Sequence, residues 1–319
     1  MAAASLDFTL DSTGKSESTL ARFAMRRPLI LFFLLAYAFA WIGWLPIILS
    51  HAGLGWIPGD LPASLIVIGL FGPTVSALTV QWVRERNLRI CHFRTSWRDL
   101  VLGLVVGVGL VLLVCVIGPA VATSRTPVRM LNWRIFLAWS PWHLLILIGG
   151  PINEEPGWRG FALPRLQRRF GAVGASVVLG LLWGAWHLPL FLLHGWARMP
   201  IGNFILLAIS LAVLFTLATN WSGFSIVVPV CMHFTVNASG FLLDGLLESA
   251  QMRPRIDLVT AAIEITVATL TVVLTRGRLG AEVATDPGMM PTRPRTNQPG
   301  KVGLLTSWAA VTKEADRKS

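Results

Sequence analysis

The sequence predicts an all-α polytopic membrane protein, a bundle of about eight transmembrane helices. Of its 319 residues, 54% are hydrophobic and only 13% are charged, with a mean hydropathy of +0.64, whereas a soluble chain carries about 25% charged residues. The apolar residues also form continuous runs of about 20, the length that a helix needs to cross a bilayer. Such runs lack the alternation of a barrel strand, and a helix satisfies its own backbone groups in lipid.

The apolar runs divide the chain into three parts. Residues 1–23 are mixed and polar and predict a flexible N-terminal arm, and residues 279–319, which are rich in Pro, Thr and Gly, predict a disordered tail. Residues 24–278 between them predict the transmembrane bundle. The predicted spans are 29–49, 61–83 with a mild interruption at Gly72 and Pro73, 100–122, 135–150, 172–193, 203–218, 225–247 and 256–274.

The distribution of arginines predicts the orientation in the membrane. Eight spans put both termini on one side, and most arginines near the span ends fall on that side, so the positive-inside rule predicts cytoplasmic termini. We expect an integral protein of a bacterial plasma membrane. Membrane topology also accounts for the net charge of +11, which therefore does not indicate nucleic acid as a partner. Tryptophans near the predicted span ends predict an interfacial belt: Trp41, Trp44, Trp56, Trp82, Trp97, Trp133 and Trp196.

Two adjacent carboxylates, Glu154 and Glu155, follow an apolar run, where acids are costly. Asn153 is a plausible N-cap, so we expect a helix to begin at about Glu154. Glu155 and Arg159 are four residues apart on one helix face and can pair. Neighbouring helical residues point about 100° apart, which leaves Glu154 free to face another group. Either a helix N-terminus at the membrane surface or a catalytic acid/base site accounts for this stretch.

Histidines occur in two later apolar runs. His187 lies one turn after Trp183, which could orient its imidazole, although a lone histidine in an apolar helix is more often a packing residue. His233 and Asn237 are four residues apart and share one helix face, which favours a common site. The intramembrane acids Asp244 and Glu264 are functional candidates by default, without an assigned role.

The absence of several motifs excludes other classes of protein. There is no H-E-x-x-H zinc motif, no G-x-S-x-G and no glycine-rich phosphate loop. The three cysteines, Cys91, Cys115 and Cys231, have no C-x-x-C spacing, which excludes a disulfide scaffold and a thiolate zinc knuckle.

The order of these motifs resembles that of the CPBP family, the CAAX-type prenyl-protein endopeptidases and their bacterial relatives, some of which are linked to bacteriocins. Glu154, Glu155 and Arg159 match its Glu-Glu-x-x-x-Arg, and His233 with Asn237 matches its His-x-x-x-Asn. Trp183 to His187 matches aromatic-x-x-x-His, with Trp where the family often has Phe. The resemblance covers about residues 135–243. It implies an intramembrane peptidase of eight helices that acts on a peptide or membrane-protein substrate, including one with a lipidated C-terminus.

The chemistry of these side chains suits peptide hydrolysis, which needs an activated water and a stabilised oxyanion. Glu154 can take a proton from water, and His187 can position that water or protonate the leaving amine. His233 and Asn237 can donate to the oxyanion. Glu155 with Arg159 would hold the helix in place, or Glu155 would share the catalytic role.

Hydrolysis with or without a bound metal ion stays open, and so do two other functions. Glu154, His187 and His233 would suit Zn²⁺ with one position left for water, whereas Asn237 is a poor zinc ligand and a good oxyanion donor. A transporter or channel would use the buried acids and histidines for ions, with Glu264 and Asp244 as important as Glu154. A non-catalytic membrane scaffold would need none of them.

Overall fold

A computed structural model of the chain describes residues 25–59, 61–91, 93, 96–113, 145, 147–196, 199–246 and 253–281; the side chains of residues 240–246 and 253–257 are not described. The predicted N-terminal arm, most of the C-terminal tail and most of the predicted span 135–150 lie outside these residues. The domain boundaries and the total of eight spans therefore stay predictions.

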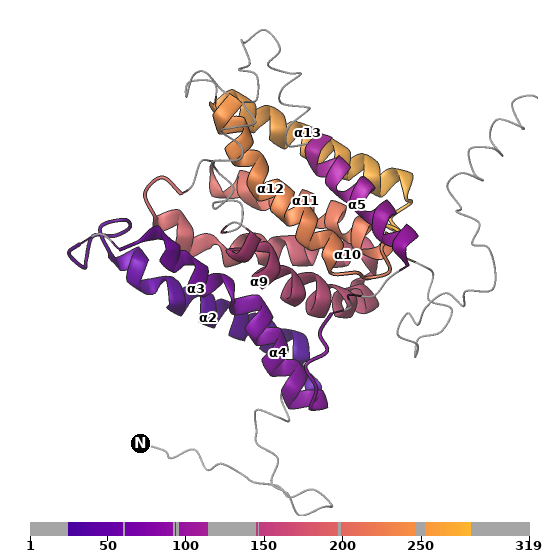
Figure 1. Cartoon of the computed structure of the whole chain (residues 1–319), viewed down its shortest axis with the longest axis horizontal. Coiled ribbons are helices and arrows are strands. Elements are labelled where there is room, and N and C mark those ends of the chain that lie inside the picture. Colours follow the sequence, from indigo (N-terminus) through magenta and orange to yellow (C-terminus); the bar gives the residue numbers. More distant parts are fainter. Residues whose placement is uncertain are drawn as a thin grey trace, which may run out of the picture. The chain divides into compact units, whose positions relative to one another are not determined.

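The described elements are all helical, as predicted (Figure 1). In chain order they are α2 (Pro28–Leu49), η1 (Ala63–Leu65), α3 (Ile66–Leu70), α4 (Gly72–Glu85), α5 (Trp97–Leu112), α9 (Pro151–Glu155), η3 (Pro156–Ala162), α10 (Leu163–Trp186), η4 (Leu188–Leu192), α11 (Ile201–Trp221), α12 (Val227–Leu246) and α13 (Arg253–Leu274). Four segments are long and apolar enough to cross a membrane: Pro28–Leu49, Ala63–Glu85, Pro151–Leu192 and Ile201–Trp221. A bundle of membrane helices is thereby confirmed.

The predicted interruption of the second span is confirmed. Helix α3 ends at Leu70 and α4 begins at Gly72, with Pro73 in the first turn, where its missing N–H breaks no helical hydrogen bond. A methyl group on Gly72 would lie 2.8 Å from the backbone oxygen of Ala36. The absence of a side chain there lets α4 pack closely on α2.

The acid stretch begins its helix earlier than predicted. Helix α9 starts at Pro151 with Gly150 as its N-cap, because proline is favoured in the first turn. The N-cap prediction for Asn153 is wrong, since its side chain lies inside the helix and donates to the backbone oxygen of Ile148. The helix continues without interruption through the π-helical turn η3 into α10.

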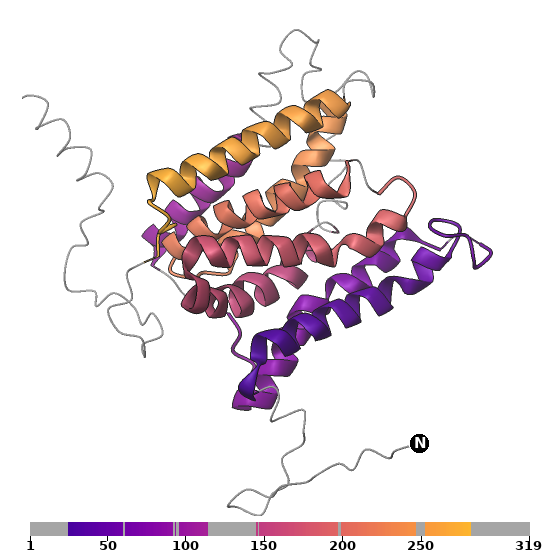
Figure 2. The same ribbon diagram turned by 180° about the vertical axis from the view of Figure 1, so that it is seen from behind.

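Helix α10 contains a sharp reversal at Gly171, where φ is +69°. A straight helix would separate Glu154 from Trp183, 29 residues later, by roughly 44 Å, yet the two side chains are hydrogen-bonded at 2.8 Å. The segment Pro151–Leu192 is therefore a hairpin of two membrane-length helices, which is visible in Figure 2. Residues 161–170, which we expected to lie between two spans, form the end of its first arm.

A cluster of buried aromatic rings joins α2 to this hairpin. The Phe32 ring packs 5.5 Å from Trp158, and the Trp44 ring packs 4.8 Å from Trp186, measured between ring centroids. Trp44 is completely buried, so its predicted place in the interfacial belt is wrong. Trp56, Trp82 and Trp97 are exposed, as that belt requires; Trp133 lies outside the described part of the chain.

Glycines set the contacts of α5 and α11. A methyl on Gly107 of α5 would meet Met232 of α12 at 2.6 Å, and one on Gly103 would meet Ser222 at 2.9 Å. Gly180 of α10 likewise lies against the backbone of α11 at Ile209. These small residues allow the close helix approach that is typical of membrane bundles, and they seat α12 beside the hairpin.

Candidate active site

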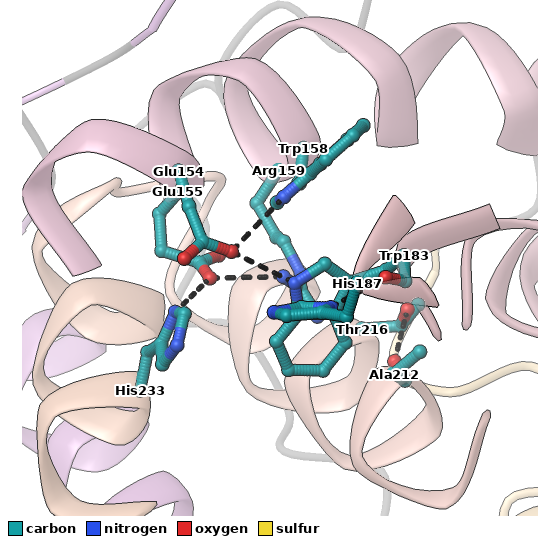
Figure 3. Close-up of polar contacts among 9 residues, drawn as sticks. All are labelled: Glu154, Glu155, Trp158, Arg159, Trp183, His187, Ala212, Thr216 and His233. Atoms are coloured by element: carbon teal, nitrogen blue, oxygen red, sulfur yellow. Dashed lines mark hydrogen bonds and ion pairs between the residues drawn. The ribbon is translucent and has the colours of Figure 1, made fainter. Parts of the chain in front are cut away.

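Three separate helical segments bring the predicted site residues together (Figure 3). Helix α9 supplies Glu154 and Glu155, and the end of α10 supplies Trp183 and His187. Helix α12 supplies His233, which contacts Glu155 across 78 residues of sequence. The side chains are buried in a membrane-spanning part of the protein: Glu154 is 2% exposed and Glu155 0%.

Two indole groups hold one oxygen of the Glu154 carboxylate. Oε2 accepts a hydrogen bond from Trp183 Nε1 at 2.8 Å and another from Trp158 Nε1 at 3.3 Å. An indole nitrogen can only donate a hydrogen bond, so Oε2 is the acceptor in both contacts. The carboxylate is thereby fixed in orientation, and its second oxygen faces another part of the site.

That second oxygen shares one small region with His233 and Asn237, next to Gly150. A methyl group on Gly150 would lie 3.2 Å from Asn237 Nδ2, 3.5 Å from Glu154 Oε1 and 3.9 Å from His233 Nε2. A carboxylate, an imidazole and an amide from α9 and α12 therefore surround a single point. Gly150 has no side chain to fill it.

The other carboxylate, Glu155, joins an arginine to the same histidine. Its Oε1 accepts from Arg159 Nη1 at 2.9 Å, which confirms the predicted pairing, and lies 2.7 Å from His233 Nδ1. Because a carboxylate accepts, Nδ1 carries a proton, and Nε2 is the nitrogen that faces Gly150. His233 thus presents opposite edges of its ring to the two acids.

Arg159 is buried between aromatic faces. Its guanidinium lies 4.9 Å from the centroid of the Trp183 ring and 4.5 Å from that of Phe215. The ion pair with Glu155 is inaccessible to solvent on both sides. Removing one partner of such a pair typically costs about 3–5 kcal/mol, because the other charge stays buried and unpaired. The pair is suited to fix the positions of α9 and His233.

His187 lies at the C-terminal end of α10 among aromatic rings. Its Nδ1 is 2.8 Å from the backbone oxygen of Trp183, so Nδ1 carries the proton and Nε2 keeps a free lone pair. Trp183 therefore orients His187 through its carbonyl group, while its indole nitrogen binds Glu154.

Helix α2 holds the turn that carries His187. Tyr37 donates its hydroxyl to the backbone oxygen of Leu182 at 2.5 Å, and Trp41 Nε1 donates to that of Trp186 at 3.0 Å. In the opposite direction, Trp186 Nε1 donates a hydrogen bond to the backbone oxygen of Ala36. The roles of Tyr37, Trp158 and Gly150 cannot be recognised from the sequence, because they depend on which helices become neighbours.

The site residues do not fit a metal centre. Within the described residues, no three His, Cys, Asp or Glu side chains are grouped so that they could hold a metal ion. The predicted zinc ligands Glu154, His187 and His233 are thus not assembled as a ligand set. Glu154 Oε2 is already engaged by two indole donors, and Asn237 presents its amide nitrogen, which is a donor and not a ligand.

Among the described residues, no contact is recorded between Glu264 and this cluster. Glu264 is 2% exposed on α13, and its Oε1 has no hydrogen-bond partner among the residues that the structure describes. The side chain of Asp244 is outside the description.

Comparison with known proteins supports the family resemblance. Residues 136–239 match the sequence model of a family described as Type II CAAX prenyl endopeptidase Rce1-like. A segment of 108 residues is 30% identical to CAAX prenyl protease 2 of Methanococcus maripaludis and covers 31% of this chain. The chain spans 40% of the length of that relative. The matched segment contains both acids and both histidines, and the resemblance of this chain to the CPBP family of proteases is confirmed.

Proposed function

We propose that the protein is an intramembrane endopeptidase in which Glu154 activates a water molecule for peptide hydrolysis. One observation carries the proposal: Glu154 Oε1, His233 Nε2 and Asn237 Nδ2 surround the same point beside Gly150. Hydrolysis requires a base and oxyanion donors at that spacing around the reacting atoms. The family resemblance supports the same reaction.

Each side chain then has one task. Glu154 Oε1 takes a proton from water as the oxygen attacks the carbonyl carbon. The resulting oxyanion accepts hydrogen bonds from Asn237 Nδ2 and from His233 Nε2, which must carry a proton for this step; the Glu155 carboxylate at Nδ1 stabilises that imidazolium. When the C–N bond breaks, Glu154 returns its proton to the amine.

His187 acts on the water and not on the oxyanion in this scheme. With its Nδ1 proton given to the Trp183 carbonyl, Nε2 can accept a hydrogen bond from the attacking water and orient it. Glu155 and Arg159 are positioning residues, which hold His233 and the acid-bearing helix.

The substrate that we propose is a membrane-associated peptide with a lipidated C-terminus. The curated relative is named for CAAX prenyl proteins, and the site lies at buried depth within apolar helices. We further propose that the protein lies in a bacterial plasma membrane with both termini in the cytoplasm, as the distribution of arginines indicates.

A cleavage assay with purified protein in lipid nanodiscs tests the function. The substrates are a prenylated C-terminal peptide, the same peptide without its lipid and an unrelated transmembrane peptide, each with and without a chelator. We expect cleavage of the prenylated peptide that survives the chelator and is absent with Glu154→Gln. Equal cleavage by parent and Glu154→Gln would show a contaminating protease or a different base. Loss with the chelator alone would contradict a mechanism without a metal.

A further inference from the structure

Three arginines gather at one end of the bundle without a carboxylate to pair with them. Arg84 lies in the last turn of α4, and Arg165 and Arg168 lie in the first arm of the hairpin, before Gly171. Arg165 Nη2 donates to Gln81 Oε1 of α4. Arg84 follows Gln81, and Arg168 follows Arg165, by three residues on the same helix face. Among the described residues, no Asp or Glu lies within ion-pair distance of any of the three. Like charges held this close are mutually destabilising unless an anion separates them.

The nearest acid is engaged elsewhere. Glu85 acts on Arg165 as the single opposing charge, but its Oε2 accepts from Gln81 Nε2 at 2.7 Å and from Asn87 Nδ2 at 3.4 Å. Gln81 in turn offers its oxygen to Arg165 Nη2 at 3.1 Å. Three positive groups therefore face one carboxylate that neutral amides already hold.

Unused donors point to a missing acceptor. The Nε atoms of Arg84 and Arg165 are both buried and have no hydrogen-bond partner in the part of the chain that is described. Arg165 is otherwise held firmly: Nη1 donates to the backbone oxygen of Phe161 at 2.8 Å, and the guanidinium lies 3.8 Å from the centroid of that ring. Buried donors without an acceptor are costly, and a phosphate group supplies several oxygens at once.

Aromatic side chains show at which depth of the membrane the arginines lie. Trp82 is 48% exposed on the last turn of α4, and Phe170 is 47% exposed next to the reversal at Gly171. Arg86 lies over the Trp82 ring and Arg169 over the Phe170 ring. Exposed aromatic rings with arginines at the ends of membrane helices mark the headgroup layer. The anions present there in quantity are lipid phosphates.

We propose that Arg84, Arg165 and Arg168 form a binding site for the headgroup of an anionic phospholipid, between α4 and the acid-bearing arm of the hairpin. The lipid phosphate would accept hydrogen bonds from the guanidinium groups of the cluster and neutralise their charge, in the manner of basic pockets between membrane helices. A bound headgroup would join α4 to the hairpin arm that carries Glu154. The proposal does not depend on the peptidase activity.

A lipid titration of the full chain in a neutral detergent tests this site. The thermal unfolding midpoint is followed while dioleoylphosphatidylglycerol, dioleoylphosphatidylcholine or inorganic phosphate is added. We expect stabilisation by phosphatidylglycerol alone. In Arg84→Gln/Arg168→Gln, neither residue donates a hydrogen bond that the structure records within the protein. The half-saturating concentration should rise on the order of fivefold for each removed arginine.

Arg278→Gln is the matched control, because Arg278 is exposed and its substitution removes the same charge outside the cluster. It should change the half-saturating concentration less than about twofold. Equal responses of parent and double variant, an equal loss in the control, or equal stabilisation by phosphatidylcholine would overturn the proposal. Stabilisation by free phosphate at the same concentration would overturn the assignment to a lipid. If the double variant unfolds without lipid, the single exposed variant Arg168→Gln should still show a fivefold shift.

Discussion

The acids of α9 and the acid of α13 are buried to the same degree but differ in the hydrogen-bond partners that surround them. Glu154 and Glu155 receive hydrogen bonds from two indoles, an arginine and a histidine. Glu264 is 2% exposed, and its Oε1 has no partner among the described residues. Burial of a carboxylate in a membrane helix is costly in both places. The difference in partners, and not burial, marks the α9 pair as an assembled site.

An ion pathway through the buried acids would make Glu264 as important as Glu154. The indole donors to Glu154 come from η3 and α10, whereas Glu264 Oε1 has no hydrogen-bond partner among the described residues. We therefore expect substitutions near Glu154 to affect cleavage far more than substitutions near Glu264.

The largest effect that we expect from a conservative change is that of Gly150→Ala. The added methyl would occupy the point between Glu154, His233 and Asn237, and the three nearest atoms are all side-chain atoms. We expect a loss of about 10²–10³ in kcat with little change in stability, because the water and the oxyanion lose their positions. Cleavage rates of the prenylated peptide measure it.

Gly109→Ala is the control for this substitution, since a methyl on Gly109 would meet no atom within 4 Å. It should keep the parent rate. A Gly150→Ala protein with a normal unfolding midpoint and normal turnover would show that the reaction does not take place between these three side chains.

An intermediate effect is expected from Tyr37→Phe and Trp41→Phe on α2. Each removes one donor to a backbone oxygen near His187. A typical hydrogen bond contributes about 1 kcal/mol, so we expect roughly a fivefold loss in kcat for each variant. KM should stay unchanged, because neither side chain touches the substrate. A rise in KM with an unchanged kcat would instead place α2 in substrate binding.

The smallest effect on catalysis, but a clear one on stability, is expected from Gly171→Ala. The reversal combines φ +69° with ψ 179°, a region that is essentially restricted to glycine and costs an L-residue roughly 1–3 kcal/mol, while a methyl there would meet nothing within 4 Å. Gly202→Ala is the matched control, with equal space and no positive φ. Unfolding midpoints should fall for Gly171→Ala alone, and turnover per folded molecule should stay constant. Equal midpoints for the two variants would show that the turn tolerates a side chain.

The sequence was sufficient to predict features that depend on local spacing. Helical periodicity predicts the Glu155–Arg159 pair, and continuous hydrophobicity predicts the spans that end near Leu49 and begin near Ile201. The break before α4 follows from Gly72 and Pro73 in the same way.

Features that depend on tertiary neighbours could not be predicted from spacing. The indole donors Trp158 and Trp183 reach Glu154 only because the chain reverses at Gly171, and nothing local to that glycine indicates a hairpin instead of a loop. The start of α9 was misplaced because Pro151 and Pro156 are both acceptable first-turn prolines, and only packing decides between them.

The most direct test of the contrast between the two acids is a side-by-side turnover measurement of Glu154→Gln and Glu264→Gln in the same nanodiscs. Both substitutions replace one buried carboxyl group by an amide and preserve volume. We predict that Glu154→Gln loses at least about 10³ in kcat, as expected for removal of a general base, whereas Glu264→Gln keeps more than about half of the parent rate, as for a position outside a site. Equal losses in the two variants would contradict the account, because the hydrogen-bond partners of Glu154 would then not distinguish it from Glu264 in catalysis.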